Sequence, residues 1–159
     1  MRALILAAGQ GTRLRPLTDD KPKCLVRLGD LSLLELSLHA LREAGIEDIT
    51  IVGGYRADQL REFGTNLVIN PQFETTNMVY SMFCAEELFA QEEDLFVVYG
   101  DIVFETKVLQ SLRQRDAEIA VVVDKNWYRL WSARMDDPLS DVETLKMDEC
   151  QRLVELGKK

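Results

Sequence analysis

The stretch LILAAGQGTRLRPLTDDKPKCL, residues 4–25, begins as an apolar run and continues as a loop rich in glycine, proline and basic side chains. The run from Arg2 to Ala8 is short, almost wholly apolar and followed by Gly9, which is typical of a strand buried on both faces of a parallel sheet. Open parallel sheets bind ligands at the carboxyl ends of their strands. The loop after this run is therefore the first candidate for a binding site.

The rest of the chain alternates between strand and helix patterns. We expect strands at 2–8, 49–52, 66–69, 94–99 and 118–123, and helices at 32–44, 57–63, 78–90 and 107–115. Ser32 and Glu35 have the capping-box spacing, and Gly45 stands where that helix should end. This order predicts an α/β fold, a Rossmann-like and mostly parallel sheet with helices on both faces. A hairpin over 142–147 and 153–156 predicts a C-terminal antiparallel extension at the sheet edge, within a single domain of residues 1–159.

Composition excludes several classes of protein. The formal net charge is −8, which argues against nonspecific binding to nucleic acid or to an anionic membrane. The three cysteines are widely spaced and include no CxxC, which favours reduced thiols and a cytoplasmic location. The first apolar run is too short to span a membrane. Homo-oligomer formation stays open.

The basic loop has the chemistry of an anion site. Glycines let backbone N–H groups approach phosphate oxygens, Arg13 can clamp a phosphate with two donors, and Lys23 adds a mobile charge. Two common phosphate motifs are absent: GxGxxG fails at Leu14, and no GKS or GKT follows the glycines. Neither a dinucleotide dehydrogenase nor a P-loop NTPase is supported.

The longer pattern Gly9-x-Gly11-Thr12-Arg13-Leu14-x-Pro16-Leu17-Thr18, followed by Pro22-Lys23-x-Leu25, resembles the signature of the sugar-phosphate and phosphocholine nucleotidyltransferases. The stretches TTNMVYSMF, VVYGDIVFE and DPLSDVETLKMD resemble most the phosphocholine cytidylyltransferase-like branch. The resemblance implies a GT-A-like fold. It also implies that Lys23 bridges the acceptor phosphate and the α-phosphate, and that the triphosphate is held by Ala8, Gly9, Gly11, Thr12 and Arg13.

Asp101 follows the apolar run 95–98 and should reach the same sheet edge as Gly9. A carboxylate facing a triphosphate requires a cation between them, and Mg²⁺ takes one or two carboxylates together with phosphate oxygens and water. The resemblance implies that Asp101 is a magnesium ligand; the alternative is an N-cap or turn residue. The family's second metal-binding aspartate would lie beyond residue 159, so we expect the chain to lack its C-terminal part.

Three polar residues further along the chain can each be interpreted in two ways. Asn70 either reads the edge of a pyrimidine base or forms the turn that Asn70-Pro71 signals. Asn77 and Ser81 share one face of the next expected helix. They either contact the ribose or serve as helix cap and small packing residue.

An aromatic group follows the expected α/β core. Trp127, Tyr128 and Trp131 either surround an ammonium group by cation–π attraction or form a hydrophobic lid. Asp136, Asp137 or Asp141 could add negative charge beside them.

The resemblance implies transfer of a nucleoside monophosphate, with CTP favoured as donor. The acceptor would be a phosphorylated or phosphonate small molecule such as phosphocholine or 2-aminoethylphosphonate, and pyrophosphate would be released. A hexose-1-phosphate nucleotidylyltransferase is the alternative within the class. A noncatalytic nucleotide-binding regulatory domain is the alternative outside it.

Overall fold

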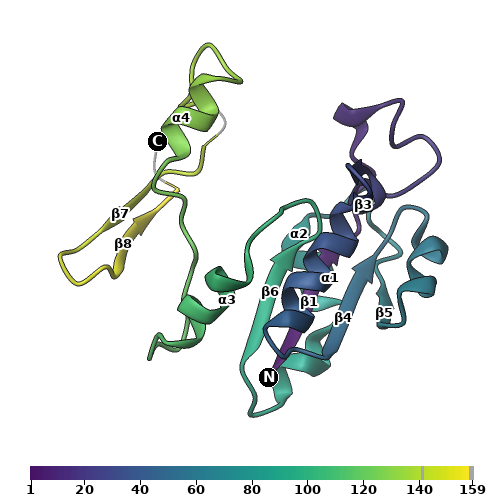
Figure 1. Ribbon diagram of the computed structural model, residues 1–159, viewed down its shortest axis with the longest axis horizontal. Helices are drawn as coiled ribbons and strands as arrows, with labels where there is room; N and C mark the ends of the chain where they lie inside the picture. Colours follow the sequence, from purple (N-terminus) through teal and green to yellow (C-terminus); the bar gives the residue numbers. More distant parts are fainter. Residues whose placement is uncertain (141, 158–159) are drawn as a thin grey trace. The chain divides into compact units, whose positions relative to one another are not determined.

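A parallel four-stranded sheet forms the centre of the fold. The computed structural model describes residues 1–140 and 142–157. The strands β1 (Arg2–Ala7), β4 (Asp48–Gly53), β5 (Asn66–Ile69) and β6 (Leu95–Tyr99) lie in the order β5-β4-β1-β6 (Figure 1). All three pairings are parallel, with Ala7 opposite Gly53 and Leu6 opposite Tyr99. The prediction of a mostly parallel α/β sheet is therefore confirmed, and β1 is one of its two inner strands.

Side chains of β1 alternate between the two faces of the sheet, as expected for a strand covered on both sides. Ala3, Ile5 and Ala7 pack in one buried cluster with residues of α1 (Leu33–Glu43), α3 (Thr106–Arg113) and the 3-10 helix η3 (Ala57–Phe63). Leu4 and Leu6 pack in a second cluster, with residues of α2 (Met78–Phe83) and the 3-10 helix η4 (Glu86–Ala90). The sheet thus has helical cover on both faces.

The expected capping box begins α1. The Ser32 hydroxyl accepts a hydrogen bond from the Glu35 backbone N–H at 3.2 Å, and the Glu35 carboxylate accepts one from the Ser32 N–H at 2.7 Å. The Ser32 hydroxyl also donates to the Glu35 carboxylate at 2.7 Å, and the hydrogen bonds from the N–H and the hydroxyl of Ser32 lower the pKa of Glu35. Gly45 follows the helix with φ +79°, a left-handed conformation that glycine adopts without strain.

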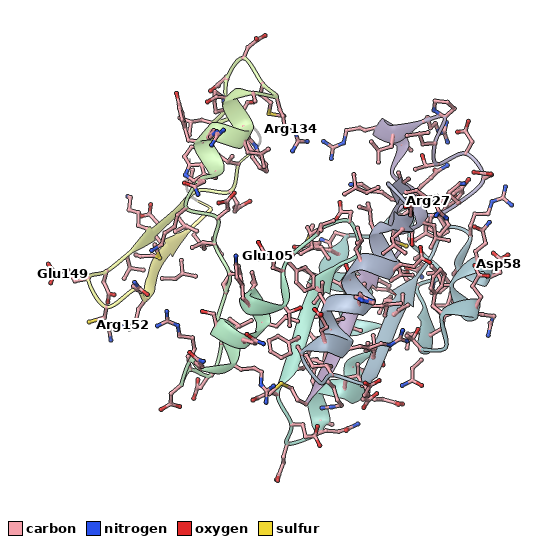
Figure 2. The ribbon with its side chains drawn as sticks, in the orientation of Figure 1. Arg27, Asp58, Glu105, Arg134, Glu149 and Arg152 are labelled. Atoms are coloured by element: carbon pink, nitrogen blue, oxygen red, sulfur yellow. The ribbon has the colours of Figure 1, made fainter. Side chains whose placement is uncertain are left out.

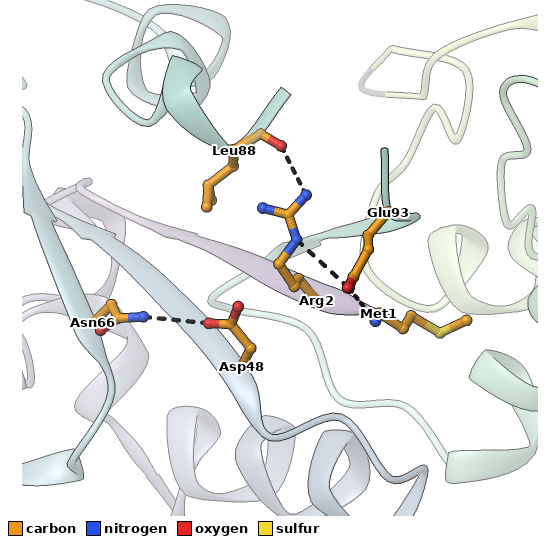
Figure 3. A network of polar contacts seen from close by, with 6 residues as sticks. All are labelled: Met1, Arg2, Asp48, Asn66, Leu88 and Glu93. Atoms are coloured by element: carbon orange, nitrogen blue, oxygen red, sulfur yellow. Dashed lines mark hydrogen bonds and ion pairs between the residues drawn. The ribbon is translucent and has the colours of Figure 1, made fainter. Parts of the chain in front are cut away.

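Polar contacts tie down the amino ends of the strands (Figure 3). The amino group of Met1 pairs with Glu93 at 2.5 Å, and the Arg2 guanidinium donates to the Leu88 carbonyl at 2.9 Å. The adjacent positive amino terminus is the main reason why the pKa of Glu93 is lowered. These contacts connect β1 to the segment before β6. They lie at the amino ends of the strands, whereas the glycine-rich loop lies at the carboxyl ends.

Two predicted elements differ from the structure. The helix expected at 78–90 is divided into α2 and η4, because the backbone turns out of the α conformation at Ala85. The strand expected at 118–123 has no regular structure, and Ile119, Val121 and Val122 are exposed. A run with high β-propensity forms a strand only beside a partner, and none of the described strands pairs with it.

The chain divides into two compact units, Met1–Ala120 and Val121–Lys159. The first also contains a small hairpin of β2 (Arg27–Leu28) and β3 (Leu31–Ser32), and the short 3-10 helices η1 (Thr12–Leu14) and η2 (Lys23–Leu25). The second contains α4 (Trp127–Ser132) and the antiparallel pair β7 (Leu145–Met147) and β8 (Leu153–Leu156), so the expected C-terminal hairpin forms. Across residues 1–140 and 142–157, no helix has the length and apolarity required to cross a membrane.

Candidate nucleotide-binding site at the carboxyl edge of the sheet

The glycine-rich loop and Asp101 emerge side by side at the carboxyl edge of the sheet. The Gly100 N–H donates to the Leu6 carbonyl at 2.9 Å, which extends the pairing of β1 and β6 past the end of β6. On the other side of β1, the Tyr55 N–H donates to the Ala8 carbonyl at 3.1 Å. Ala8 is buried and Gly9 is exposed, so the chain leaves the sheet at this point.

Gly11 lies directly against the side chain of Lys23. Its φ of +73° is a left-handed conformation, and a Cβ placed there would lie 2.8 Å from the Lys23 Cβ and 2.9 Å from its Cγ. The hydroxyl of the buried Thr18 donates to the Gly11 carbonyl at 3.0 Å. A side chain at position 11 would therefore displace the aliphatic part of Lys23.

Contacts from the segment after β4 hold the middle of the loop. The Tyr55 hydroxyl donates to the Asp19 carbonyl at 2.6 Å, and the Gln59 amide donates to the Asp20 carbonyl at 2.7 Å. Sequence reasoning did not find these two anchors, because nothing in the pattern of 55–59 singles them out. They give the basic loop a defined position relative to β4.

Lys23 and Asp101, predicted separately, form an ion pair across the sheet edge. Their side chains are 34% and 35% exposed, so solvent and a ligand can reach both. An ammonium and a carboxylate in contact can be separated by a ligand that offers an anion to one and a cation to the other. A metal–triphosphate complex has this charge arrangement.

The neighbouring Cys24 is buried, and burial raises the pKa of its thiol to about 12, with the negative charge of Asp101 adding to the effect. Its sulfur is therefore a neutral packing group.

Thr12 and Arg13 lie in η1 and are exposed. The Arg13 guanidinium makes no hydrogen bond or ion pair with any residue that the structure describes, so its donors are available to a ligand. Gly9 has no neighbouring atom within 4 Å of a Cβ built upon it. The predicted phosphate-binding groups thus lie on an accessible stretch beside the Lys23–Asp101 pair.

Asn70, Asn77 and Ser81 form one hydrogen-bonded group between β5 and α2. The Asn70 amide is completely buried; it donates to Ser81 Oγ and Thr76 Oγ1, each at 3.0 Å, and accepts from the Gln72 N–H at 2.8 Å. These contacts match the turn and packing interpretations. Sequence reasoning missed Thr76, whose hydroxyl completes the group.

Asn77 is exposed and caps α2, where its side-chain oxygen Oδ1 accepts from the Tyr80 N–H at 3.1 Å. The Ser81 hydroxyl donates to the Asn77 carbonyl at 3.3 Å. Contacts of these residues with a base or ribose remain predictions.

The aromatic residues predicted for the acceptor lie in the second unit. Trp127 and Tyr128 form an edge-to-face pair with ring centroids 5.5 Å apart. The guanidinium of Arg134, a residue labelled in Figure 2, lies 5.2 Å from the centroid of the Trp131 ring, a contact that the sequence analysis missed. Asp136 is exposed two residues later, whereas Asp141 lies outside the described residues.

The site can hold magnesium only if phosphate oxygens and water complete the coordination of the ion. Among residues 1–140 and 142–157, no group of three or more His, Cys, Asp or Glu residues could hold a metal ion. Asp101 supplies a hard oxygen ligand beside the glycine-rich loop. That arrangement suits Mg²⁺, which takes few protein carboxylates and fills its remaining positions with phosphate oxygens and water.

Comparison with known proteins identifies the family of the chain. Residues 3–155 match the family described as MobA-like NTP transferase domain, and the chain belongs to this family. The resemblance to nucleotidyltransferases is thereby confirmed. The chain is 42% identical over 168 residues to the CTP:phosphoglutamine cytidylyltransferase of Campylobacter jejuni, with 100% of the chain and 66% of that protein covered.

Solved structures include similar folds. The CTP:phosphocholine cytidylyltransferase from Streptococcus pneumoniae matches with a TM-score of 0.57 and 36% identity over 67% of this chain and 49% of that chain. The inositol-1-phosphate CTP transferase from T. maritima matches with a TM-score of 0.72 over 99% of this chain and 64% of that chain. At 24% identity it supports the fold alone. The chain thus spans about half to two thirds of the length of these relatives.

Proposed function

We propose that the chain binds CTP at the carboxyl edge of its sheet and transfers CMP to a phosphorylated or phosphonate small molecule, with release of pyrophosphate. The observation that carries this proposal is the Lys23–Asp101 ion pair beside Gly11, because it places one anion-binding and one cation-binding group at the glycine-rich loop. The names of the similar proteins, a phosphoglutamine and a phosphocholine cytidylyltransferase, support CTP as the donor.

In the proposed reaction, an oxygen of the acceptor's phosphate or phosphonate attacks the α-phosphorus of CTP. A phosphorus–oxygen bond forms as the bond from the α-phosphorus to the oxygen bridging to the β-phosphate breaks, and pyrophosphate leaves with that electron pair. The attacking oxygen is already anionic, so no strong general base is needed. Catalysis then consists mainly of positioning and charge stabilisation.

Each residue has a defined part in this proposal. Backbone N–H groups from Gly9 to Thr12 and the Arg13 fork bind the triphosphate, and Lys23 turns from Asp101 toward the α-phosphate and the acceptor phosphate. Asp101 would hold Mg²⁺. The ion, when bound, offsets phosphate charge and orients the oxygens.

The test is a turnover assay that measures pyrophosphate release from CTP with phosphoglutamine, phosphocholine, 2-aminoethylphosphonate and glucose 1-phosphate as acceptors. We expect Lys23→Met to lower kcat/KM by at least a hundredfold while the protein stays folded. Lys107→Met is the matched control, because Lys107 is an exposed lysine on α3 that pairs with Glu105. Wild-type rates in a folded Lys23→Met protein would refute the role of Lys23. A preference for glucose 1-phosphate would favour the hexose-1-phosphate alternative.

A further inference from the structure

Tyr55 holds both ends of the segment that carries the proposed phosphate-binding groups. Its backbone N–H donates to the Ala8 carbonyl at 3.1 Å, where the chain leaves β1, and its hydroxyl donates to the Asp19 carbonyl at 2.6 Å. Residues 9–18, which include the glycines and Arg13, lie between these two points. One residue thus fixes the beginning and the end of the loop relative to β4.

The loop has few buried side chains of its own. Across residues 12–20, Thr18 is buried and Leu14 is half-buried, and the others are exposed. A segment with so little burial depends for its conformation on hydrogen bonds from neighbouring elements. Loss of the Tyr55 hydroxyl should therefore loosen the loop without unfolding the protein, because water can replace the donor at the exposed Asp19.

The ring of Tyr55 also contacts the turn after β5. It packs edge-on against Phe73, with ring centroids 6.2 Å apart and ring planes at 60°. Phe73 in turn lies against Gly54, where a Cβ would stand 2.5 Å from the Phe73 Cβ and 2.7 Å from the Ala8 carbonyl oxygen. That spacing leaves no room for a side chain at position 54. The turn after β5 is thus packed closely against the start of the loop, with the Tyr55 ring beside it.

Arg56, the residue after Tyr55, has a left-handed backbone with a φ of +49°. Residues other than glycine rarely adopt this conformation, and such strain persists where the surrounding structure requires it. The Arg56 guanidinium lies 5.8 Å from the centroid of the Tyr55 ring. The Tyr55 ring thus has Phe73 and Arg56 as neighbours, and both contacts restrict the direction in which its hydroxyl points.

We propose that Tyr55 is a positioning residue for nucleotide binding, whose hydroxyl holds residues 9–18 in the conformation that binds the triphosphate. The inference rests on the proposed function, because this loop is the proposed triphosphate site. When part of the free protein has its loop in another conformation, the apparent affinity falls in proportion to the competent fraction. One hydrogen bond shifts such an equilibrium by roughly two- to tenfold.

Calorimetric titration of Mg·CTP into the wild type, Tyr55→Phe and Tyr80→Phe tests the role of the hydroxyl. Tyr55→Phe removes the donor to Asp19 and keeps the ring that packs on Phe73. Tyr80→Phe is the matched control, because Tyr80 is an exposed tyrosine on α2. We expect Tyr55→Phe to bind roughly two- to tenfold more weakly and Tyr80→Phe to bind like the wild type. The Tm of Tyr55→Phe should fall by no more than about 2–4 °C.

A double-mutant cycle with Arg13→Gln separates positioning from a general loss of stability. If Tyr55 acts through the loop that carries Arg13, Tyr55→Phe should weaken Mg·CTP binding by less than about twofold once Arg13 has been replaced. Wild-type affinity in Tyr55→Phe, or an equal loss of affinity with and without Arg13, would refute the positioning role.

The turnover assay distinguishes this inference from the proposed function. Tyr55→Phe should raise the KM for CTP by the factor that calorimetry gives, and should leave kcat and the KM for the acceptor within about twofold of the wild type. Weaker CTP binding by Tyr55→Phe, in a protein that releases no pyrophosphate with any acceptor, would support the positioning role and refute the proposed transfer. Turnover with the same KM for CTP in the wild type and Tyr55→Phe would support the transfer and refute the positioning role.

Discussion

Gly11→Ala is the substitution whose effect follows most directly from the geometry of the loop. Gly11 and Gly29 both have left-handed backbones, with φ of +73° and +69°. Alanine in that conformation costs roughly 1–2 kcal/mol. Both variants should therefore lose similar stability, and a chain of this size loses about 2–4 °C in Tm per kcal/mol. Only Gly11 has a neighbour to displace, because a Cβ at Gly29 would meet nothing within 4 Å.

The additional effect at Gly11 falls on Lys23. A new Cβ would lie 2.8 Å from the Lys23 Cβ, whereas carbon atoms pack best at about 3.5–4.0 Å, so the lysine must move. An ammonium 4 Å from a unit negative charge gains about 1 kcal/mol in water and about 4 kcal/mol at an effective dielectric constant of 20. Because Lys23 is 34% exposed, we expect its displacement to cost about 1–2 kcal/mol of binding free energy. This corresponds to a five- to thirtyfold loss of CTP affinity.

The assay pairs thermal denaturation with calorimetric titration of Mg·CTP for the wild type, Gly11→Ala and Gly29→Ala. We expect similar falls in Tm for the two variants and weaker binding only in Gly11→Ala. Equal CTP affinity in all three proteins would refute the proposal that the contact between Gly11 and Lys23 positions the lysine for CTP binding. An equal loss of CTP affinity in both variants would show that backbone strain, and not displacement of Lys23, causes the effect.

Three further predictions concern stability, thiol chemistry and pH dependence. Ser32→Ala should cost about 1 kcal/mol in urea denaturation, since it removes the N-cap hydroxyl of α1; a change under about 0.3 kcal/mol would contradict the cap's role. With its pKa raised from 9.0 to about 12, buried Cys24 should resist a thiol reagent at pH 8 until the chain unfolds, whereas exposed Cys150 should react at once. The stability that a neutral Cys24 contributes is complete below pH 9.0 and is lost as the pH rises through about 12, and a Cys24→Ala variant should lack this part of the pH dependence.

The central strands could be predicted because each is a short apolar run that ends at a glycine or asparagine. The position of Asp101 followed from the same logic, since parallel strands bring their carboxyl ends to one edge. The contact between Asp101 and Lys23 could not be predicted, because 78 residues separate the two and only the packed loop brings them together. The strand expected at 118–123 was wrong because a local pattern does not reveal whether a partner strand exists.

Side-chain partners were the part that the sequence could not reveal. The amide of Asn70 has two plausible uses from its pattern, and only burial shows that its described contacts are internal. Arg134 escaped notice because a basic residue three positions after a tryptophan is ordinary on a surface. Only the structure shows that its guanidinium lies 5.2 Å from the centroid of the Trp131 ring.

The central claim is that a metal-bound nucleoside triphosphate occupies the glycine-rich loop between Lys23 and Asp101. Calorimetric titration of CTP into the wild type and Asp101→Asn, each with Mg²⁺ and with EDTA, tests it most directly. We predict that Mg²⁺ tightens CTP binding at least tenfold in the wild type. In Asp101→Asn this gain should disappear, while binding in EDTA should be equal to or tighter than that of the wild type, because Lys23 has lost its carboxylate partner. Equal wild-type affinity with Mg²⁺ and with EDTA, or an undiminished magnesium effect in Asp101→Asn, would contradict the claim.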